Sequence, residues 1–488
     1  MIRPFHVLLP ALGALAGCSL APDYKPPEVL TPAAYKEAGP WAVAQPADEK
    51  PRRDWWKDFG DSTLDDLEAQ IDSQNPDLAA SVARYDQARA YVSQVDASMF
   101  PTVGLNASAT DNRQSAKRPL RSANQPNQYA ANTIGLQASY EIDFWGQIRN
   151  TVAAGEATAQ ASAADMETVR LGLHAELASD YVALRGFDAE LKLLTDTEQA
   201  YLHAQALTTA RYEAKVASGI DVSRSESQLE SARALESDVR AQRAIFEHAI
   251  ASLVGKPASE FSIVPAVLKL PVPAEPTGLP SSLLQRRPDI ASDERKVAAA
   301  NANIGVAKAA FYPNILLNLM GGFQSTGGGL GLLSAPYSFW SVGPSLALPL
   351  FEGGMRHAVE AGAYAARDEA AANYRSTVLG AFQEVEDNLA LLHHLGQETV
   401  DETQAVTAAE HTADLSLTLY HDGAASYLDV VVSQTDALGA ERTLLDLNTR
   451  RLQADIKLIR AVGGGWSTTD LPTTEMVDTL PERPKSNS

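Results

Sequence analysis

The chain contains one sequence pattern twice, and this repeat limits what it can fold into more than any other feature. Residues Asn75–Leu78 return as Arg287–Ile290, 212 positions later, and Ala217–Val222 returns as Ala425–Val430, 208 positions later. Such a period is far longer than that of solenoid repeats, which reaches about 50 residues. The sequence therefore predicts one large module duplicated within a single chain of 488 residues.

Composition excludes several classes of function. The chain carries 40 Lys and Arg against 61 Asp and Glu, so we expect no surface that binds the phosphates of nucleic acid. The only cysteine, Cys18, provides neither a disulfide framework nor a cysteine-ligated metal site. His393-His394 lacks the HExxH order, and the glycines at 327–331 lack the Lys-Ser/Thr of a phosphate-binding loop. We therefore expect neither an enzyme nor a cofactor.

The N-terminus has the order of a secretory signal peptide, expected at residues 1–17. Arg3 precedes a short apolar stretch and small residues, and the stretch is too short to span a bilayer as a helix. Leu15–Cys18 resembles the bacterial lipobox, which implies N-acyl and diacylglycerol lipid on Cys18, palmitate included. Ser19 resembles the residue that follows this cysteine in outer membrane lipoproteins. The alternative is a small apolar cysteine within an ordinary signal peptide.

Two long intervals without proline predict long helices. No proline occurs between residues 126 and 257 or between 349 and 472, although the chain has 27. Both intervals are rich in good helix formers, and apolar residues recur there every seven positions, as in helices that pack side by side as coiled coils. Each interval has one break, so a long helix followed by a shorter antiparallel helix is expected twice. The four helices are expected at 147–217, 221–255, 353–421 and 427–462.

Four stretches outside these helices alternate apolar and polar residues, which is the pattern of strands with one apolar and one polar face. The strands are expected at 100–112, 130–145, 312–324 and 338–351. Shorter helices are expected at 62–73 and 288–310. Strands of this length can cross an outer membrane, whereas no stretch outside the signal peptide is apolar enough for a spanning helix.

Four strands are too few to close a barrel, since the smallest barrels use about eight. An open sheet in lipid would leave unsatisfied backbone groups along both edges. If these strands are transmembrane, the chain must therefore oligomerise. Two copies would give a barrel filled by side chains, and three or more would leave an aqueous lumen.

These features predict a linear order of segments. After the signal peptide we expect a lipidated extended tether, the first repeat, a proline-rich linker, the second repeat and a flexible tail. Their expected bounds are 18–60, 61–257, 258–280, 281–466 and 467–488.

The chain resembles the outer membrane factor family, the TolC, OprM and NodT type exit ducts of tripartite efflux pumps and type I secretion systems. The resemblance rests on the lipobox, the duplication and a set of motifs in the family's order. These motifs are Trp55-Trp56, Arg287–Ile290, Ala310–Pro313, Leu348–Gly354 and Tyr427–Val430. It implies a membrane α+β fold: a homotrimer whose four strands per chain form a twelve-stranded β-barrel, continued by a long coiled-coil barrel of helices in the periplasm. It also implies outer membrane lipids, a periplasmic adaptor (membrane fusion) protein and an inner membrane pump, most often of RND type, as partners.

The resemblance places the gate at the periplasmic helix tips. Relatives carry a ring of leucines in the second tip, and Leu428 occupies that place. One turn later relatives often carry an aspartate, where this chain has Val432. Because apolar constrictions gate by excluding water, we predict a mainly hydrophobic gate in which Leu428 and Val432 face the axis and Asp429 supplies the remaining charge. The alternative is that Leu428 and Val432 are ordinary seam residues of a helix pair.

The predicted function is passive export of small molecules, such as drugs and toxic compounds, through an outer membrane duct. Both tips are expected to dock the adaptor through Ser218, Gly219, Ile220, Asp221, Ala425, Ser426 and Tyr427. Three alternatives remain from the sequence alone: a type I protein secretion duct, a lipid-anchored periplasmic scaffold whose alternating segments are half-buried strands, and an enzyme with an unrecognised site.

Overall fold

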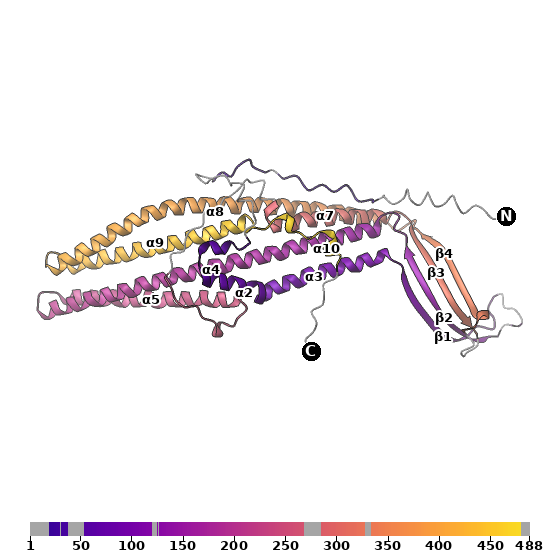
Figure 1. Ribbon diagram of the computed structural model, residues 1–488, viewed down its shortest axis with the longest axis horizontal. Helices are drawn as coiled ribbons and strands as arrows, with labels where there is room; N and C mark the ends of the chain where they lie inside the picture. Colours follow the sequence, from indigo (N-terminus) through magenta and orange to yellow (C-terminus); the bar gives the residue numbers. More distant parts are fainter. Residues whose placement is uncertain are drawn as a thin grey trace.

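The computed structural model describes residues 19–29, 31–37, 53–119, 124, 126–267, 285–326 and 333–479. Within these ranges the protein is a long rod of helices with an inclined sheet of four strands at one end (Figure 1). Cys18, the signal peptide and most of the expected linker lie outside the described residues.

A helix, two strands, a long helix and a short helix follow in the same order in both repeats. The tether ends with η2 (Trp55–Phe59). The first repeat contains α2 (Ser62–Gln74), α3 (Pro76–Asp96), η3 (Ala97–Met99), β1 (Thr102–Arg113), β2 (Gln128–Glu141), α4 (Gln147–Glu213) and α5 (Gly219–Leu253), and η4 (Ala258–Glu260) follows it. The second contains α7 (Pro288–Ala309), β3 (Asn314–Ser325), η6 (Ala335–Tyr337), β4 (Ser338–Ala347), α8 (Met355–His421) and α9 (Tyr427–Ala461), and η7 (Thr468–Asp470) and α10 (Thr474–Val477) follow.

The two long helices are equal in length, as are the two short ones. α4 and α8 have 67 residues each, and α5 and α9 have 35 each. Each long helix packs antiparallel against the short helix that follows it, and α4 also contacts α9. The two hairpins therefore run side by side and turn at the same end of the rod, away from the sheet (Figure 1). No helix in the described ranges is long and apolar enough to cross a membrane.

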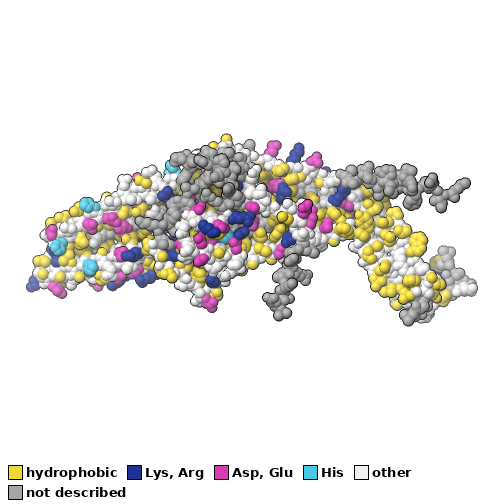
Figure 2. Space-filling view, viewed as in Figure 1, with side chains coloured by type: hydrophobic (Ala, Val, Ile, Leu, Met, Phe, Trp, Pro, Cys, Tyr) yellow, Lys and Arg dark blue, Asp and Glu magenta, His cyan; other side chains and the backbone are white. Residues whose placement is uncertain are grey.

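The sheet is antiparallel in the order β1-β2-β3-β4. Thr102 lies opposite Ser139 in the first repeat, and Asn314 lies opposite Ala347 in the second, so the register is the same at spacings of 212 and 208. β2 pairs with β3 and joins the repeats. The outer edges of β1 and β4 have no partner strand within the sheet. Hydrophobic side chains cover much of the visible face of the strands (Figure 2).

Two of the expected strands end earlier than predicted. The strand expected to reach 351 ends at Ala347, shortly before Pro349, which has no N–H to donate. The strand expected to reach 145 ends at Glu141, because Asp143 instead binds the first turn of the next helix, which begins at Gln147. The Asp143 carboxylate accepts hydrogen bonds from the backbone N–H groups of Ile148 (3.1 Å) and Arg149 (2.9 Å) at the first turn of α4.

Small side chains allow close packing where the repeats meet. The first part of α4 packs against α7, and Ala157, Ala161 and Ala164 are buried there. Gly305 of α7 has no room for a side chain, since an added Cβ would lie 2.4 Å from Asn150 Nδ2. Because small residues line this contact and the Asn150 side chain fills the space at Gly305, α4 and α7 pack closely and hold the two repeats together.

Both terminal segments contribute to the core, and for the tail this corrects an expectation. The described part of the tether is anchored by buried side chains, since Tyr35, Trp55 and Phe59 are 6, 2 and 2 % exposed. The flexible tail was expected from residue 467, but its described part forms α10, and Val477 packs with Val92 and Ala159. Burial of these apolar side chains stabilises both segments against the helices.

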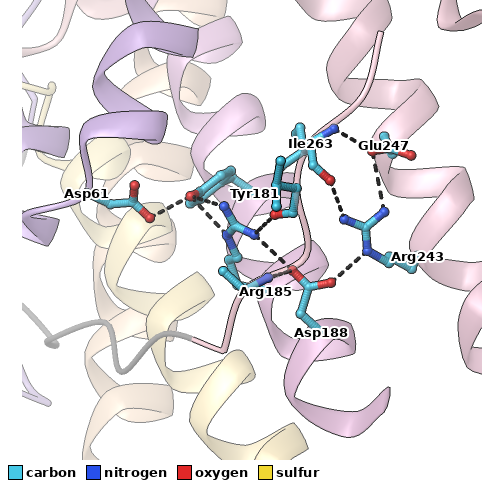
Figure 3. A network of polar contacts seen from close by, with 9 residues as sticks. Asp61, Tyr181, Arg185, Asp188, Arg243, Glu247 and Ile263 are labelled. Atoms are coloured by element: carbon cyan, nitrogen blue, oxygen red, sulfur yellow. Dashed lines mark hydrogen bonds and ion pairs between the residues drawn. The ribbon is translucent and has the colours of Figure 1, made fainter. Parts of the chain in front are cut away.

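A buried polar network joins α4, α5 and the segment that follows η4 (Figure 3). Asp188 of α4 accepts hydrogen bonds from Arg185 Nη1 (2.9 Å), Arg243 Nε of α5 (2.6 Å) and the N–H of Ala266 (3.0 Å). Arg185 also donates to the Tyr181 hydroxyl at 2.9 and 2.8 Å. Burial raises the pKa of Tyr181 to about 12, so its hydroxyl stays protonated. The network compensates its buried charges and fixes the end of the first repeat.

The tip turns differ between the repeats at one strained position. Lys215 has φ 64° and is the residue 208 positions before Gly423, which has φ 77°. A side chain in this left-handed conformation costs about 1–2 kcal/mol, whereas glycine adopts it freely. The first tip is therefore strained where the second is not.

We predict that Lys215→Gly stabilises the first tip by about 1 kcal/mol, after allowing for the greater freedom of glycine in the unfolded chain. Hydrogen exchange of the Val216 and Ala217 amides, which donate to the Arg211 carbonyl, should slow roughly fivefold. The matched change Gly423→Lys should accelerate exchange of Ala424 and Ala425. Faster exchange in Lys215→Gly would show that the left-handed strain is unimportant.

We also predict that Asp188→Ala lowers the free energy of unfolding by about 3–5 kcal/mol, because it removes the carboxylate that pairs with the buried guanidinium of Arg185 and takes one acceptor from Arg243. Thermal unfolding of the detergent-solubilised protein measures the loss. Asp196→Ala on the same helix is the control, since its pair with Lys192 is 61 % exposed on both sides and should cost less than about 0.5 kcal/mol. Equal losses in the two variants would contradict a stabilising role of the network.

Candidate functional site

The two hairpin tips are the candidate site, at the end of the rod opposite the sheet (Figure 1). Both are built in the same way. Ser218 caps α5 and Ser426 caps α9, each in a capping box with the aspartate three residues later, Asp221 or Asp429. Serine at the cap and aspartate in the first turn satisfy backbone N–H groups and favour an abrupt start of each short helix.

The carboxylate of Asp429 is engaged in this cap. It accepts hydrogen bonds from the Ser426 hydroxyl (2.8 Å) and the Ser426 N–H (3.0 Å). These bonds lower the pKa of Asp429, so the carboxylate is ionised at neutral pH. The negative charge that the sequence placed at the gate is therefore present at the tip, but it is oriented toward Ser426.

A small core holds the two hairpins together near their tips. Tyr427 and Val430 of α9 pack with Tyr420 of α8 and Ala204 of α4. Tyr427 is 2 % exposed, so its side chain contributes to packing rather than to a docking surface. Gln228 of α5 adds a polar link between the hairpins: its Nε2 donates to Gln434 Oε1 of α9 at 3.2 Å, and its Oε1 accepts from the Tyr427 hydroxyl at 3.5 Å.

Arg211, near the end of α4, makes a second link that the sequence analysis missed. Its guanidinium donates to the carbonyls of Tyr420 (3.0 Å) and His421 (3.1 Å) at the end of α8 and lies 4.7 Å above the Tyr420 ring. A cation at the C-terminal end of a helix is stabilised by the helix dipole. The only signal in the sequence is a difference between the repeats, because Leu419 stands 208 positions after Arg211.

The predicted gate residues share one exposed face of α9. Leu428 is 44 % exposed and Val432, one turn later, is 51 % exposed, and both lie outside the core that Tyr420, Tyr427 and Val430 form. In the first repeat the counterparts 208 positions earlier are Ile220 and Arg224. The second tip thus presents two adjacent apolar side chains where the first presents one.

The other residues expected to dock a partner lie at the ends of the tips. Ser218, Gly219, Ile220 and Ser426 are exposed, and Ile220 is 63 % exposed. Asp221 and Ala425 are partly buried. Within the described ranges no group of three His, Cys, Asp or Glu side chains is arranged to hold a metal ion. The exposed surface of the tips is thus partly apolar, through Ile220, Leu428 and Val432.

Known proteins resemble the chain along nearly its whole length. It is 31 % identical over 461 residues to the probable efflux pump outer membrane protein TtgC of Pseudomonas putida, and 93 % of each chain is covered. It is 29 % identical to the cation efflux system protein CusC of Escherichia coli, with 95 % of this chain and 98 % of CusC covered.

The fold is shared with solved channels. The outer-membrane channel OprN superposes with a TM-score of 0.86 at 29 % identity, over 92 % of this chain and all of OprN. The outer membrane efflux protein family matches residues 68–256 and 279–464, one segment in each repeat. The chain therefore belongs to the outer membrane efflux protein family.

Proposed function

We propose that the protein is the outer membrane exit duct of a tripartite efflux pump, gated at its helical tips. The single observation that carries the gating proposal is the exposed apolar pair Leu428 and Val432, at the tip of a 35-residue helix paired with a 67-residue one. Helices of this length reach ~100 Å at 1.5 Å per residue, which suits a conduit through the periplasm. The strands supply the passage through the outer membrane.

We further propose that three copies assemble around one axis and dock a periplasmic adaptor and an inner membrane pump. Names of relatives support the efflux role, since TtgC and CusC are described as parts of efflux systems. The open sheet edges support assembly, because four strands cannot close a barrel. Exposed Ile220 and Ser426 at the tips suit contact with an adaptor, and an RND-type pump is the proposed energy source.

The transported compounds are proposed to be small molecules of varied chemistry. The names of three relatives refer to toluene, cations and pyoverdine. All three share about 30 % identity with this chain, so similar ducts serve chemically different compounds. A duct that selected strongly would not suit such different compounds. We therefore assign selectivity to the partner pump and passive conduction to this chain.

Acylation of Cys18 is proposed to anchor the mature chain in the outer membrane. The proposal rests on the Leu-Ala-Gly-Cys order at residues 15–18. Mass spectrometry of the N-terminal peptide tests it: diacylglycerol and N-acyl groups should be found on Cys18, and an unmodified cysteine would contradict it.

The gate is proposed to close by excluding water rather than by binding cations. Three copies of Leu428 and Val432 would form two stacked apolar rings, and a narrow apolar constriction empties of water. We predict that Leu428→Ala combined with Val432→Ala raises the conductance of the closed channel in a planar bilayer several-fold. Ile220→Ala in the first tip is the matched control and should leave conductance unchanged. A double variant as tight as the wild type would refute the gate assignment.

Restoring a charged ring should change the character of the gate. We predict that Val432→Asp makes conductance sensitive to millimolar divalent cations, because three close carboxylates bind them. The wild-type channel should respond little under the same conditions. If the wild-type channel is blocked as strongly as the variant, the charge of Asp429 dominates the constriction and the apolar gate is wrong.

A protein secretion duct is the second candidate, and its test is direct. In a strain that lacks this chain, efflux should fail and small toxic compounds should accumulate. Loss of a secreted protein with unchanged compound tolerance would favour the secretion duct instead.

A further inference from the structure

A buried acid–base pair joins α2 to α4. Glu68 of α2 and His174 of α4 are 0 and 3 % exposed, and Glu68 Oε2 lies 2.6 Å from His174 Nδ1. The other carboxylate oxygen, Glu68 Oε1, is buried without a hydrogen-bond partner among the described residues. A carboxylate in such surroundings is costly as an anion, so a proton is favoured there. We propose that Glu68 and His174 share a proton that locks α2 and the tether onto α4 in acid and releases them as the pH rises.

The charges around the pair favour its protonated form. They come from the tether, α2 and α4, and belong to Arg53, Asp54, Asp65, Asp72, Glu167 and Arg170. Both arginines bind other carboxylates. Arg170 Nε lies 2.8 Å from Asp72 Oδ1, and Arg53 Nη2 lies 3.0 Å from Asp470 Oδ1. Asp72 Oδ1 also lies 3.4 Å from His174 Nε2, so the imidazole has an acid on each side and a proton on the pair is stabilised.

The residue type at position 174 adds a titratable group to the helix rather than volume. In the second repeat Phe382 stands 208 positions after His174 and is buried in an apolar core, so an aromatic hydrocarbon ring fills that place. Farther along α4, the carboxylate of Asp188 is held by arginines, whose charge does not change with pH. Histidine is the side chain that changes its charge near neutral pH. The junction at Glu68 therefore responds to pH where the one at Asp188 does not.

The tether reads the state of the pair through Trp56. Its indole stacks on the His174 ring, with centroids 4.5 Å apart and planes at 14°. The face of an indole attracts a cation, so a protonated imidazole holds the tether more tightly than a neutral one. A cavity of about 30 Å³ lies beside the ring, lined in part by Trp56, Gly463 and Trp466. This space admits one water molecule, which gives the proton a route to and from the buried pair.

The direction of the pH effect follows from the carboxyl group. Burial raises the pKa of Glu68 from its ordinary value of 4.5 to about 7. A group whose pKa is higher in the folded state binds its proton more tightly there, so protonation favours the folded junction. The stabilisation is complete below about pH 4.5 and is lost as the pH rises through about 7. The tether leads from Cys18, so acid strengthens the link between the proposed membrane anchor and the rod.

Hydrogen exchange of the α2 amides tests the proposal in the full chain, purified from outer membranes in detergent. After correction for the intrinsic exchange rate, protection should fall about tenfold between pH 6 and pH 8 and level off above, because opening releases one proton in this range. Glu68→Gln should abolish this pH dependence. Asp66→Asn is the matched control, since Asp66 is exposed on the same helix, and it should keep the wild-type dependence.

A second variant keeps the proposal testable if Glu68→Gln does not fold. Asp72→Asn removes a negative charge beside the imidazole, at a side chain that is 40 % exposed and tolerates the change. The midpoint of the protection curve should move to lower pH by about half a unit, because less negative charge then holds the proton. Protection of α2 that is constant between pH 5 and pH 8 in the wild type would overturn the proposal. An unshifted midpoint in Asp72→Asn, or a pH dependence that persists in Glu68→Gln, would do the same.

Discussion

The backbone hydrogen bonds that the sheet cannot complete within one chain govern the rest of the structure. β1 and β4 each keep an unpaired edge, and in lipid every unsatisfied backbone group costs several kcal/mol. In a soluble sheet, water can form hydrogen bonds with the backbone groups of such edges. The bilayer core contains no water to do so. The strands are thus stable in the membrane only when further copies close the ring. Because α4 and α8 continue directly from β2 and β4, closure of the strands also brings the long helices into a tube.

Duplication reduces the number of different contacts that this tube requires. The contacts between repeats inside one chain, β2 with β3 and α4 with α7, are of the same kind as those needed between chains. Small residues such as Gly305 fix the distance at one of them, where an added Cβ would lie 2.4 Å from Asn150. Three chains of two repeats would then present six similar units around the axis. Similar units at similar distances close a ring with little strain at any one junction.

The strands and helices could be predicted from local sequence patterns, whereas contacts between residues far apart in the sequence could not. Alternation located β1 to within two residues, and the proline-free intervals located α8 to within two at either end. The end of β4 was not predicted correctly, because the sequence still alternates apolar and polar residues near Pro349, whereas a proline has no N–H for the strand's hydrogen bonds. The buried network of Arg185, Asp188 and Arg243 was not predicted, because Asp188 of α4 and Arg243 of α5 are 55 positions apart in the sequence. At the tips the serine caps follow from local rules, but Arg211 acts on carbonyls more than 200 positions away.

The two tips share their serine caps but differ in several side chains around them. Ile220 and Arg224 stand where the second tip has Leu428 and Val432, and Arg211 has no counterpart. If the gate opens by separation of the two hairpins, the links from Arg211 to the carbonyls of Tyr420 and His421 must break. Two such charge-assisted bonds at a partly exposed site contribute on the order of 1–3 kcal/mol in all. A coupling energy of this size is what binding of a partner at a second site typically supplies, so an adaptor that prefers the separated tips could open the duct without chemical energy of its own.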